Sequence, residues 1–361
     1  MTQRIFNFNP GPAAIPLIVL EKLKREMLDF RESGMSILEI SHRSKLFEAV
    51  LNGAIERAKR LLGLDERFRV LFIQGGASLQ FAMVPMNLAV PGKPLDYVDT
   101  GTWATRAIKE ALTTGKQVRV VASSEDKEYT YIPEDIPVNP DAAYLHVTSN
   151  NTIRGTQWQS FPETGCVPLI SDMSSDILSR RFDPSPFGLF YAGAQKNLGP
   201  AGVTLVVIRE DMLERVPKEL STMLKYTTYS KDNSLYNTPP VFTIYVCSLV
   251  LEWIEETVGG MEQIEEINRE KADLIYNYLD SQDFYRGTAR PDSRSLMNVT
   301  FRLPSPELET KFLAESPNAG LGGLKGHRSV GGCRASIYNA VTLEAVGTLV
   351  DFMKGFVKKN G

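Results

Sequence analysis

Hydrophobic residues along the chain follow two patterns, short apolar runs and longer stretches with helical spacing. The runs are rich in β-branched and aromatic residues, which is typical of buried strands. Between them, apolar residues recur three and four positions apart on otherwise polar segments, which indicates amphipathic helices. Strands that alternate with helices predict an α/β domain with a mainly parallel sheet. We expect strands at 70–73, 95–98, 117–122, 142–147, 167–170, 189–192 and 203–208, and helices at 17–30, 45–62, 79–88 and 104–112.

The pattern changes after the last of these strands. Residues 226–240 are polar and aromatic, and we expect them to form an exposed segment that can reach a neighbouring subunit. Two glycines at 259–260 then end a helix, and the mixed elements that follow indicate a smaller α+β domain. We therefore expect a large domain at 16–260 and a small domain at 1–15 and 261–361. The elements predicted here are helices at 242–256, 261–279, 307–315 and 343–358, and strands at 295–302 and 334–338.

Polar and glycine residues gather at the carboxyl ends of the predicted strands, where ligands bind in a parallel sheet. Gly76, Ala77 and Ser78 lie between a strand and a helix, a geometry that presents backbone N–H groups to an anion or simply reverses the chain. An aspartate at the end of an apolar strand is costly to desolvate unless it meets a cation or a donor. The other polar or aromatic residues at this edge are Trp103, Thr152 and Asp172.

Lys196 belongs to the same edge, since it follows an apolar run. Gly193 and Ala194 remove side-chain bulk beside it, so that a flat ligand could approach the backbone. A lysine on a short ordered connection within apolar sequence is expected to have a lowered pKa and a usable amine. The alternative is an ordinary solvated lysine on a surface loop.

Together these residues form the set that pyridoxal 5′-phosphate requires. Lys196 would bind the cofactor aldehyde as a Schiff base, and Asp172 would keep the ring nitrogen protonated. The freed amine would then move a proton between the substrate α-carbon and the cofactor, which is the central step of transamination. The remaining predicted cofactor contacts are ring stacking by Trp103, hydrogen bonds from Thr152 and Gln195, and phosphate binding by Gly76, Ala77 and Ser78.

Basic residues offer a further candidate site. The chain has three histidines, and two of them, His42 and His327, directly precede an arginine, Arg43 and Arg328. Such pairs are either solvated surface or an anion site. Strand alternation places Arg334 on the polar face of its strand.

Composition excludes several classes of protein. With 43% hydrophobic and 23% charged residues and a net charge of −3, the chain is typical of a globular protein without a nucleic-acid footprint. No apolar stretch has the length of a signal peptide or a membrane span, so we expect a cytoplasmic protein without a membrane contact.

Cys166, Cys247 and Cys333 lack metal-ligand spacing and are expected to be buried thiols. His146 is expected to satisfy a core hydrogen bond.

Five segments carry a resemblance to a known family: residues 6–12, 41–43, 191–202, 236–240 and 326–340. With these segments, the sequence resembles the phosphoserine aminotransferases, class V members of the fold-type I pyridoxal phosphate enzymes, over essentially its whole length. The resemblance implies that the sheet of the large domain has seven strands.

The resemblance also implies an activity and a set of residue roles. Such enzymes exchange an amino group between L-glutamate and 3-phosphohydroxypyruvate, giving O-phospho-L-serine and 2-oxoglutarate in serine biosynthesis, and some act on a phosphohydroxythreonine in vitamin B6 synthesis. A homodimer is implied, in which Asn237 and Thr238 reach the cofactor phosphate of the other subunit. Ser78 is a departure, because some members have an arginine there. The implied substrate-binding residues are Arg334 for the α-carboxylate, and His42, Arg43, His327 and Arg328 for the distal phosphate or carboxylate.

Other interpretations stay open at this point. Another class V enzyme, such as an alanine:glyoxylate-type aminotransferase or a cysteine desulfurase, would use the same cofactor. A desulfurase needs a cysteine on a mobile loop, whereas Cys333 directly precedes Arg334 on a predicted strand. In a non-catalytic phosphate- or nucleotide-binding module, Lys196 would be structural.

Overall fold

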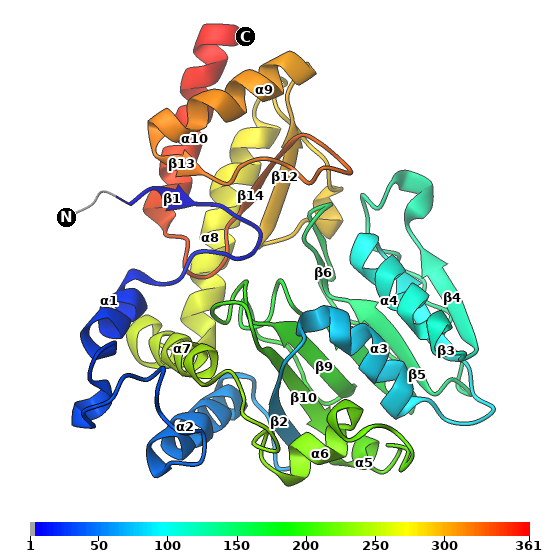
Figure 1. Ribbon diagram of the computed structural model, residues 1–361. Helices are drawn as coiled ribbons and strands as arrows, with labels where there is room; N and C mark the ends of the chain where they lie inside the picture. The colour runs from blue at the N-terminus through cyan, green and yellow to red at the C-terminus, as the bar shows by residue number, and fades with distance from the viewer. Residues whose placement is uncertain (1–3) are drawn as a thin grey trace.

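A seven-stranded sheet forms the centre of the larger part of the molecule (Figure 1). The computed structural model describes residues 4–361. Only β10 runs against its neighbours, while the other neighbouring strands of this sheet are parallel. The predicted mainly parallel, seven-stranded sheet is therefore confirmed. In spatial order the strands are β2 (Phe68–Ile73), β10 (Thr204–Arg209), β9 (Phe187–Gly193), β8 (Leu169–Asp172), β5 (Tyr144–Thr148), β3 (Leu95–Asp99) and β4 (Val118–Ser123).

Side-chain alternation along the strands builds a core on each face of this sheet. In β2, Val70 and Phe72 pack into a core with α1, α2 and α7, whereas Leu71 and Ile73 pack into another with α3, α4 and α6. Ser44 fixes the start of α2, because its side chain accepts a hydrogen bond from the Phe47 amide. The helices are α1 (Leu17–Glu26), α2 (Lys45–Leu61), α3 (Gly76–Leu88), α4 (Thr102–Thr113), α5 (Glu210–Leu213), α6 (Tyr226–Lys231) and α7 (Val241–Glu252), which a π-helix continues over Trp253–Val258.

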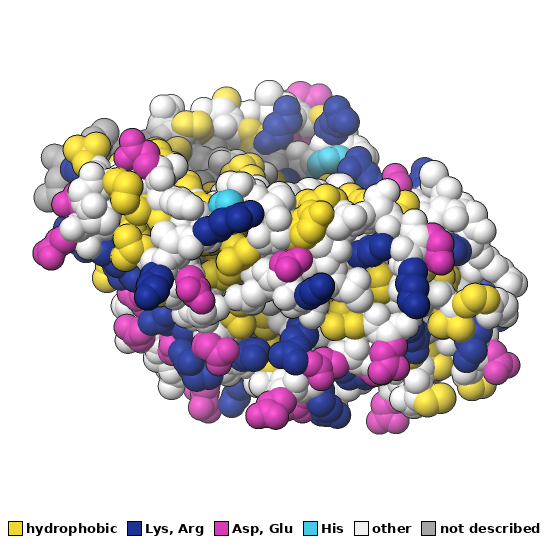
Figure 2. Space-filling view, turned by 60° about the horizontal axis from the view of Figure 1, so that its bottom comes forward, with side chains coloured by type: hydrophobic (Ala, Val, Ile, Leu, Met, Phe, Trp, Pro, Cys, Tyr) yellow, Lys and Arg dark blue, Asp and Glu magenta, His cyan; other side chains and the backbone are white. Residues whose placement is uncertain are grey.

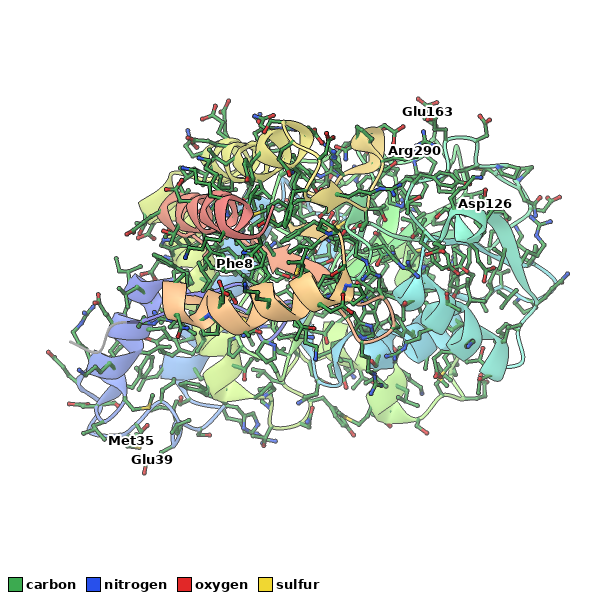
Figure 3. The ribbon with its side chains drawn as sticks, turned by 90° about the horizontal axis from the view of Figure 1, so that it is seen from above. Phe8, Met35, Glu39, Asp126, Glu163 and Arg290 are labelled. Carbon is green, nitrogen blue, oxygen red and sulfur yellow. The ribbon has the colours of Figure 1, made fainter. Side chains whose placement is uncertain are left out.

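A third core lies above the large sheet in the view of Figure 1. The helix α8 joins the two regions, since Ile264 packs below with the large sheet and Ile275 packs above. Figure 3 shows Phe8 in the interior between α9 and α10, and this residue belongs to the upper core. The elements here are β1 (Phe6–Asn7) paired with β13 (Leu321–Gly322), the antiparallel strands β11 (Arg286–Gly287), β12 (Asn298–Arg302) and β14 (Cys333–Ser336), and the helices α8 (Met261–Asp280), α9 (Pro306–Glu315) and α10 (Leu343–Asn360).

Two predictions about exposure are wrong. Residues 226–240 are not exposed throughout, because α6 packs on the sheet and the buried Tyr226 hydroxyl donates to Gln80 Oε1 at 2.7 Å. Cys166 is exposed, since it lies in the loop before β8 instead of in a core. His146 does satisfy a core hydrogen bond, with Nε2 3.0 Å from the Tyr191 hydroxyl. Within residues 4–361, no helix combines the length and the apolar character needed to cross a membrane.

Candidate active site

The carboxyl ends of the large sheet bring three predicted residues around one amine. Lys196 follows β9, and its Nζ donates a hydrogen bond to Thr152 Oγ1 at 2.7 Å. Trp103 lies in the first turn of α4, with its ring centroid 5.7 Å from the same Nζ. Thr152 follows the short strand β6 (Asn150–Asn151), which pairs with β7 (Thr156–Gln157). The amine therefore has a polar contact on one side and an aromatic face nearby.

The electrostatic surroundings of Lys196 make its amine available near neutral pH. Burial lowers the pKa of Lys196 to about 8, although the Asp172 carboxylate acts in the opposite direction. The positive charge of Arg334 lowers this pKa further. The direction agrees with the lowered pKa expected from the sequence, and a partly deprotonated amine is a nucleophile.

Asp172 is the last residue of β8, and its side chain is buried, with 5% of the residue exposed. Its Oδ1 accepts a hydrogen bond from the Ser174 amide at 2.9 Å. Burial raises the pKa of Asp172, whereas the Ser174 hydrogen bond and the Lys196 charge lower it. Within residues 4–361 no salt bridge neutralises this carboxylate. A cationic N–H group from a ligand would therefore be well matched to it.

The predicted phosphate turn has the backbone geometry of an anion site. Gly75 and Gly76 both have left-handed φ angles, of 101° and 65°, and a Cβ on Gly75 would lie 2.5 Å from the Leu79 side chain. No side chain of the described part of the chain caps the start of α3, so its first N–H groups at Gly76, Ala77 and Ser78 can bind an anion.

Asn237 and Thr238 lie near the same turn of their own chain. The Thr238 carbonyl accepts a hydrogen bond of 3.4 Å from Gln74 Nε2, directly before the glycines. The Oδ1 atom of Asn237 is buried and has no hydrogen-bond partner within residues 4–361. This segment therefore adjoins the turn but leaves one acceptor unused.

Arg334 adds a buried cation to the Lys196 site. It lies on β14 with 4% of its surface exposed, and its Nη1 donates to the Thr152 carbonyl at 3.0 Å. Burial lowers the pKa of Arg334, and its Nε has no partner within residues 4–361. Burial, then the charges of Arg334, Arg328 and Arg106, lower the pKa of His327. These residues thus form one positive region beside the amine, suited to an anionic substrate.

The chain matches known proteins over nearly its whole length. The family model described as aminotransferase class V matches residues 5–349. The chain belongs to the class V aminotransferases. It is 70% identical to the phosphoserine aminotransferase of Syntrophobacter fumaroxidans, with 100% of both chains covered.

Two solved structures show how closely the fold agrees. The phosphoserine aminotransferase of Bacillus circulans subsp. alkalophilus is 56% identical, with a TM-score of 0.97 and 99% of each chain covered. A PLP-bound phosphoserine aminotransferase of Trichomonas vaginalis is 40% identical, with a TM-score of 0.92, covering 97% of this chain and 100% of that one. The predicted fold-type I architecture and the predicted transaminase class are therefore confirmed.

The site of this class V aminotransferase fits pyridoxal 5′-phosphate. Among the described residues, 4–361, the buried Asp172 carboxylate has no ion-pair partner and no side chain caps the start of α3, while the lysine amine lies near an aromatic face. These features suit the ring nitrogen, the phosphate and the aldehyde of that cofactor, respectively.

The site also contains residues that the sequence did not single out. Gly11 covers the lysine, because a Cβ on it would lie 3.4 Å from Lys196 Cγ and 3.5 Å from Gln195 Cγ. The Arg106 guanidinium lies 4.9 Å from the centroid of Trp103. The contact of Arg106 with Trp103 could have been predicted, because the two residues are one helical turn apart. The contact of Gly11 with Lys196 could not, because it depends on tertiary packing.

The two His–Arg pairs are not brought together within one chain. Arg43 Nε donates to His42 Nε2 at 3.4 Å, and the pair directly precedes α2. In Figure 1, α2 lies at the bottom, whereas the loop between β13 and β14, which carries His327 and Arg328, lies in the upper part. Figure 2 likewise shows histidine at two separate places on one face, each beside basic side chains. A shared distal anion site therefore needs more than one chain in this conformation.

Proposed function

We propose that this class V aminotransferase exchanges an amino group between L-glutamate and 3-phosphohydroxypyruvate, giving O-phospho-L-serine and 2-oxoglutarate. The observation that carries the choice of substrate is the 70% identity, over both full chains, to a phosphoserine aminotransferase. The geometry supports it, because a buried arginine and a basic loop adjoin the amine. The same site would accept the phosphohydroxythreonine pair, which has the same charged groups.

Each residue around Lys196 is assigned a separate contact with the cofactor. Bound pyridoxal 5′-phosphate supplies an electron-accepting ring that stabilises negative charge at the substrate α-carbon. Lys196 would provide the covalent attachment for the cofactor, and its free amine would carry the proton at that carbon. Asp172 would hold a proton on the ring nitrogen, because its carboxylate is buried and forms no salt bridge within residues 4–361. The other contacts are stacking by Trp103, hydrogen bonds from Thr152 and Gln195, and phosphate binding by Gly76, Ala77 and Ser78.

The basic residues orient the substrate. Arg334 binds the α-carboxylate, and its rigid guanidinium allows two parallel hydrogen bonds. His327 and Arg328 bind the distal phosphate of one substrate or the side-chain carboxylate of the other. Because His42 and Arg43 lie apart from this loop in one chain, we infer that they complete the distal site across a subunit interface.

A homodimer is part of this proposal. Apolar side chains are exposed along the amino-terminal segment, and Figure 3 shows Met35 projecting from the rim of the molecule. Such a patch is suited to burial against a second copy. In that dimer, Asn237 and Thr238 bind the cofactor phosphate of the other subunit through the donors of their side chains, the Asn237 amide N–H groups and the Thr238 hydroxyl. The unused Asn237 Oδ1 acceptor is available to a donor at the interface. The exposed apolar residues of this segment are Ile5, Leu17, Ile18, Leu28, Met35 and Leu38.

The domain boundary and the compartment are also proposals. Ala14 packs against the upper core and Ile15 against a core of the large sheet, which supports a large domain of 16–260 and a small domain of 1–15 and 261–361. The three cysteines are unpaired, which supports action in the reducing cytoplasm.

Separate half-reactions test the function. We expect purified protein loaded with pyridoxal phosphate to change its visible absorption with glutamate, and to recover it with 3-phosphohydroxypyruvate. Alanine and glyoxylate serve as the matched control pair and should leave the spectrum unchanged. A spectrum that responds only to the control pair would assign an alanine:glyoxylate activity instead. A protein that gains no visible band with added cofactor would be a non-catalytic module.

A further inference from the structure

A second lysine, Lys271, lies inside the protein away from the predicted site residues. It is on α8, is fully buried, and its Nζ donates to the backbone carbonyls of Ile337 at 2.9 Å, Tyr338 at 2.8 Å and Val341 at 3.0 Å. An ammonium has three protons, so all of them are used. Burial lowers the pKa of Lys271 to about 7. Burying such a group is unfavourable unless it is hydrogen-bonded, as the three carbonyls make it here.

The carbonyls belong to residues 337–341, which follow β14 and reach the Lys196 turn from one side. The Asn339 amide donates to Asn197 Oδ1 at 3.0 Å, and Asn197 is the next residue after the reactive lysine. Asn197 is itself fixed, because its Nδ2 donates to the Ile177 carbonyl at 3.0 Å. The position of Asn339 therefore constrains the backbone that carries Lys196.

The same segment also contacts the strip that covers Lys196 from the other side. The Tyr338 hydroxyl donates to the Pro10 carbonyl at 2.8 Å. The next residue, Gly11, is the one that packs against Lys196 Cγ. Tyr338 and Asn339 thus hold both boundaries of the lysine side chain.

The helix α8 also binds residues 337–341 through a second side chain. Asn268, three residues before Lys271 and on the same helical face, donates to Asn339 Oδ1 at 2.8 Å. Figure 1 shows α8 rising beside β14, so one rigid helix presents both anchors. Because α8 also packs against the large sheet through Ile264, the segment is fixed relative to that sheet.

We propose that Lys271 is a positioning residue for transamination, which holds residues 337–341 so that Tyr338 and Asn339 fix Lys196 between Pro10–Gly11 and Asn197. The inference rests on the proposed function, since it assigns to Lys271 the placement of the amine that moves the proton. Removing the ammonium takes one donor from each of the three carbonyls, although the Tyr338 carbonyl still accepts from the Val341 amide at 2.9 Å. The segment therefore shifts and the Lys196 amine loses its fixed position.

The test compares Lys271→Met with Tyr276→Phe, both made in the full-length, cofactor-loaded protein. Tyr276 is the control because it is a buried residue of the same helix and its change removes one hydrogen bond, to the Ser295 carbonyl, outside residues 337–341. We expect Lys271→Met to shift the pH midpoint of the cofactor absorption band by about half a unit or more. We also expect the rate constant for glutamate to fall about tenfold, with KM within about threefold. The control should change neither quantity.

A second variant keeps the test decisive if Lys271→Met does not fold. Tyr338→Phe leaves the three carbonyls in place and removes only the side-chain hydroxyl toward Pro10, so it should shift the same midpoint in the same direction by less. A folded variant of either kind with the wild-type midpoint and rate would overturn the inference alone. A wild-type protein that forms no band or ignores glutamate would overturn the proposed function together with it.

Discussion

Two lysines, the partly buried Lys196 and the fully buried Lys271, show what separates a reactive amine from a structural one. Burial lowers the pKa of both, to about 8 and about 7. Lys196 Nζ donates to the Thr152 hydroxyl and faces the Trp103 ring, whereas three backbone carbonyls enclose Lys271 Nζ. A nucleophile needs a direction from which a carbon atom can approach its nitrogen. A lowered pKa alone therefore does not identify the catalytic lysine, and the arrangement of its acceptors does.

Among the variants that test the comparison of the two lysines, we expect the loss of Lys196 to have the largest effect. We expect Lys196→Ala to lower kcat by about 10⁴-fold or more, because no other amine lies at the substrate carbon to move its proton. Steady-state assays with glutamate and 3-phosphohydroxypyruvate measure it. Lys271→Met, which leaves the nucleophile in place, should retain far more activity. Equal losses in the two variants would mean that the distinction between the lysines is wrong.

Arg334→Ala should have the next largest effect. Losing a charge-assisted pair with the α-carboxylate should lower kcat/KM by about 10²-fold in both half-reactions. Because Arg334 lowers the pKa of Lys196, its removal should also raise that pKa. The matched control is Arg43→Ala, which should act mainly on KM through the distal anion. Normal half-reactions in Arg334→Ala would contradict the assignment of the carboxylate clamp.

The lowered pKa of Lys196 predicts a pH dependence in the protein stripped of cofactor. Its amine is protonated below about 8 and neutral above, whereas a solvated lysine stays protonated up to about 10.5. The rate at which added pyridoxal phosphate regains its protein-bound band should therefore rise about tenfold per unit below pH 8 and level off above pH 9. Stopped-flow absorption measures it. A rate that still rose tenfold between pH 9 and 10 would show an ordinary lysine.

Thr152→Val should give the smallest effect. The Thr152 hydroxyl accepts a hydrogen bond from Lys196 Nζ and so favours the charged amine. Valine has nearly the same shape without the acceptor, so the midpoint of the pH profile above should move down by about half a unit. Thr156→Val, a buried threonine on β7 nearby, is the control and should leave the midpoint unchanged. An upward shift in Thr152→Val would show that the hydroxyl does not stabilise the ammonium.

The large sheet and the position of Lys196 could be predicted because their signals are local. The strand runs, the glycine turn and the small residues before Lys196 all lie within a few positions of the features they predict. The family resemblance added substrate roles that spacing alone did not give. The exposure of Cys166 was missed because the number and spacing of cysteines do not indicate whether one of them lies in a loop or in a core.

The role of Lys271 could not be predicted for the opposite reason. In the sequence it is one charged position of an amphipathic helix, and its partners lie 66 to 70 residues further along the chain. The separation of α2, which follows Arg43, from the β13–β14 loop, which carries Arg328, was also hidden. Two similar motifs predict the same chemistry without giving their relative positions. Tertiary contacts decide both features, and a pattern along one chain does not contain them.

Chemical fixation of the cofactor tests the central distinction most directly. The loaded protein is reduced with borohydride and digested, and its lysine-containing peptides are mapped by mass spectrometry. We expect the added cofactor mass on Lys196, with none on Lys271, although burial lowers the pKa of both. Cofactor fixed on Lys271, or spread over surface lysines at a comparable yield, would contradict the account.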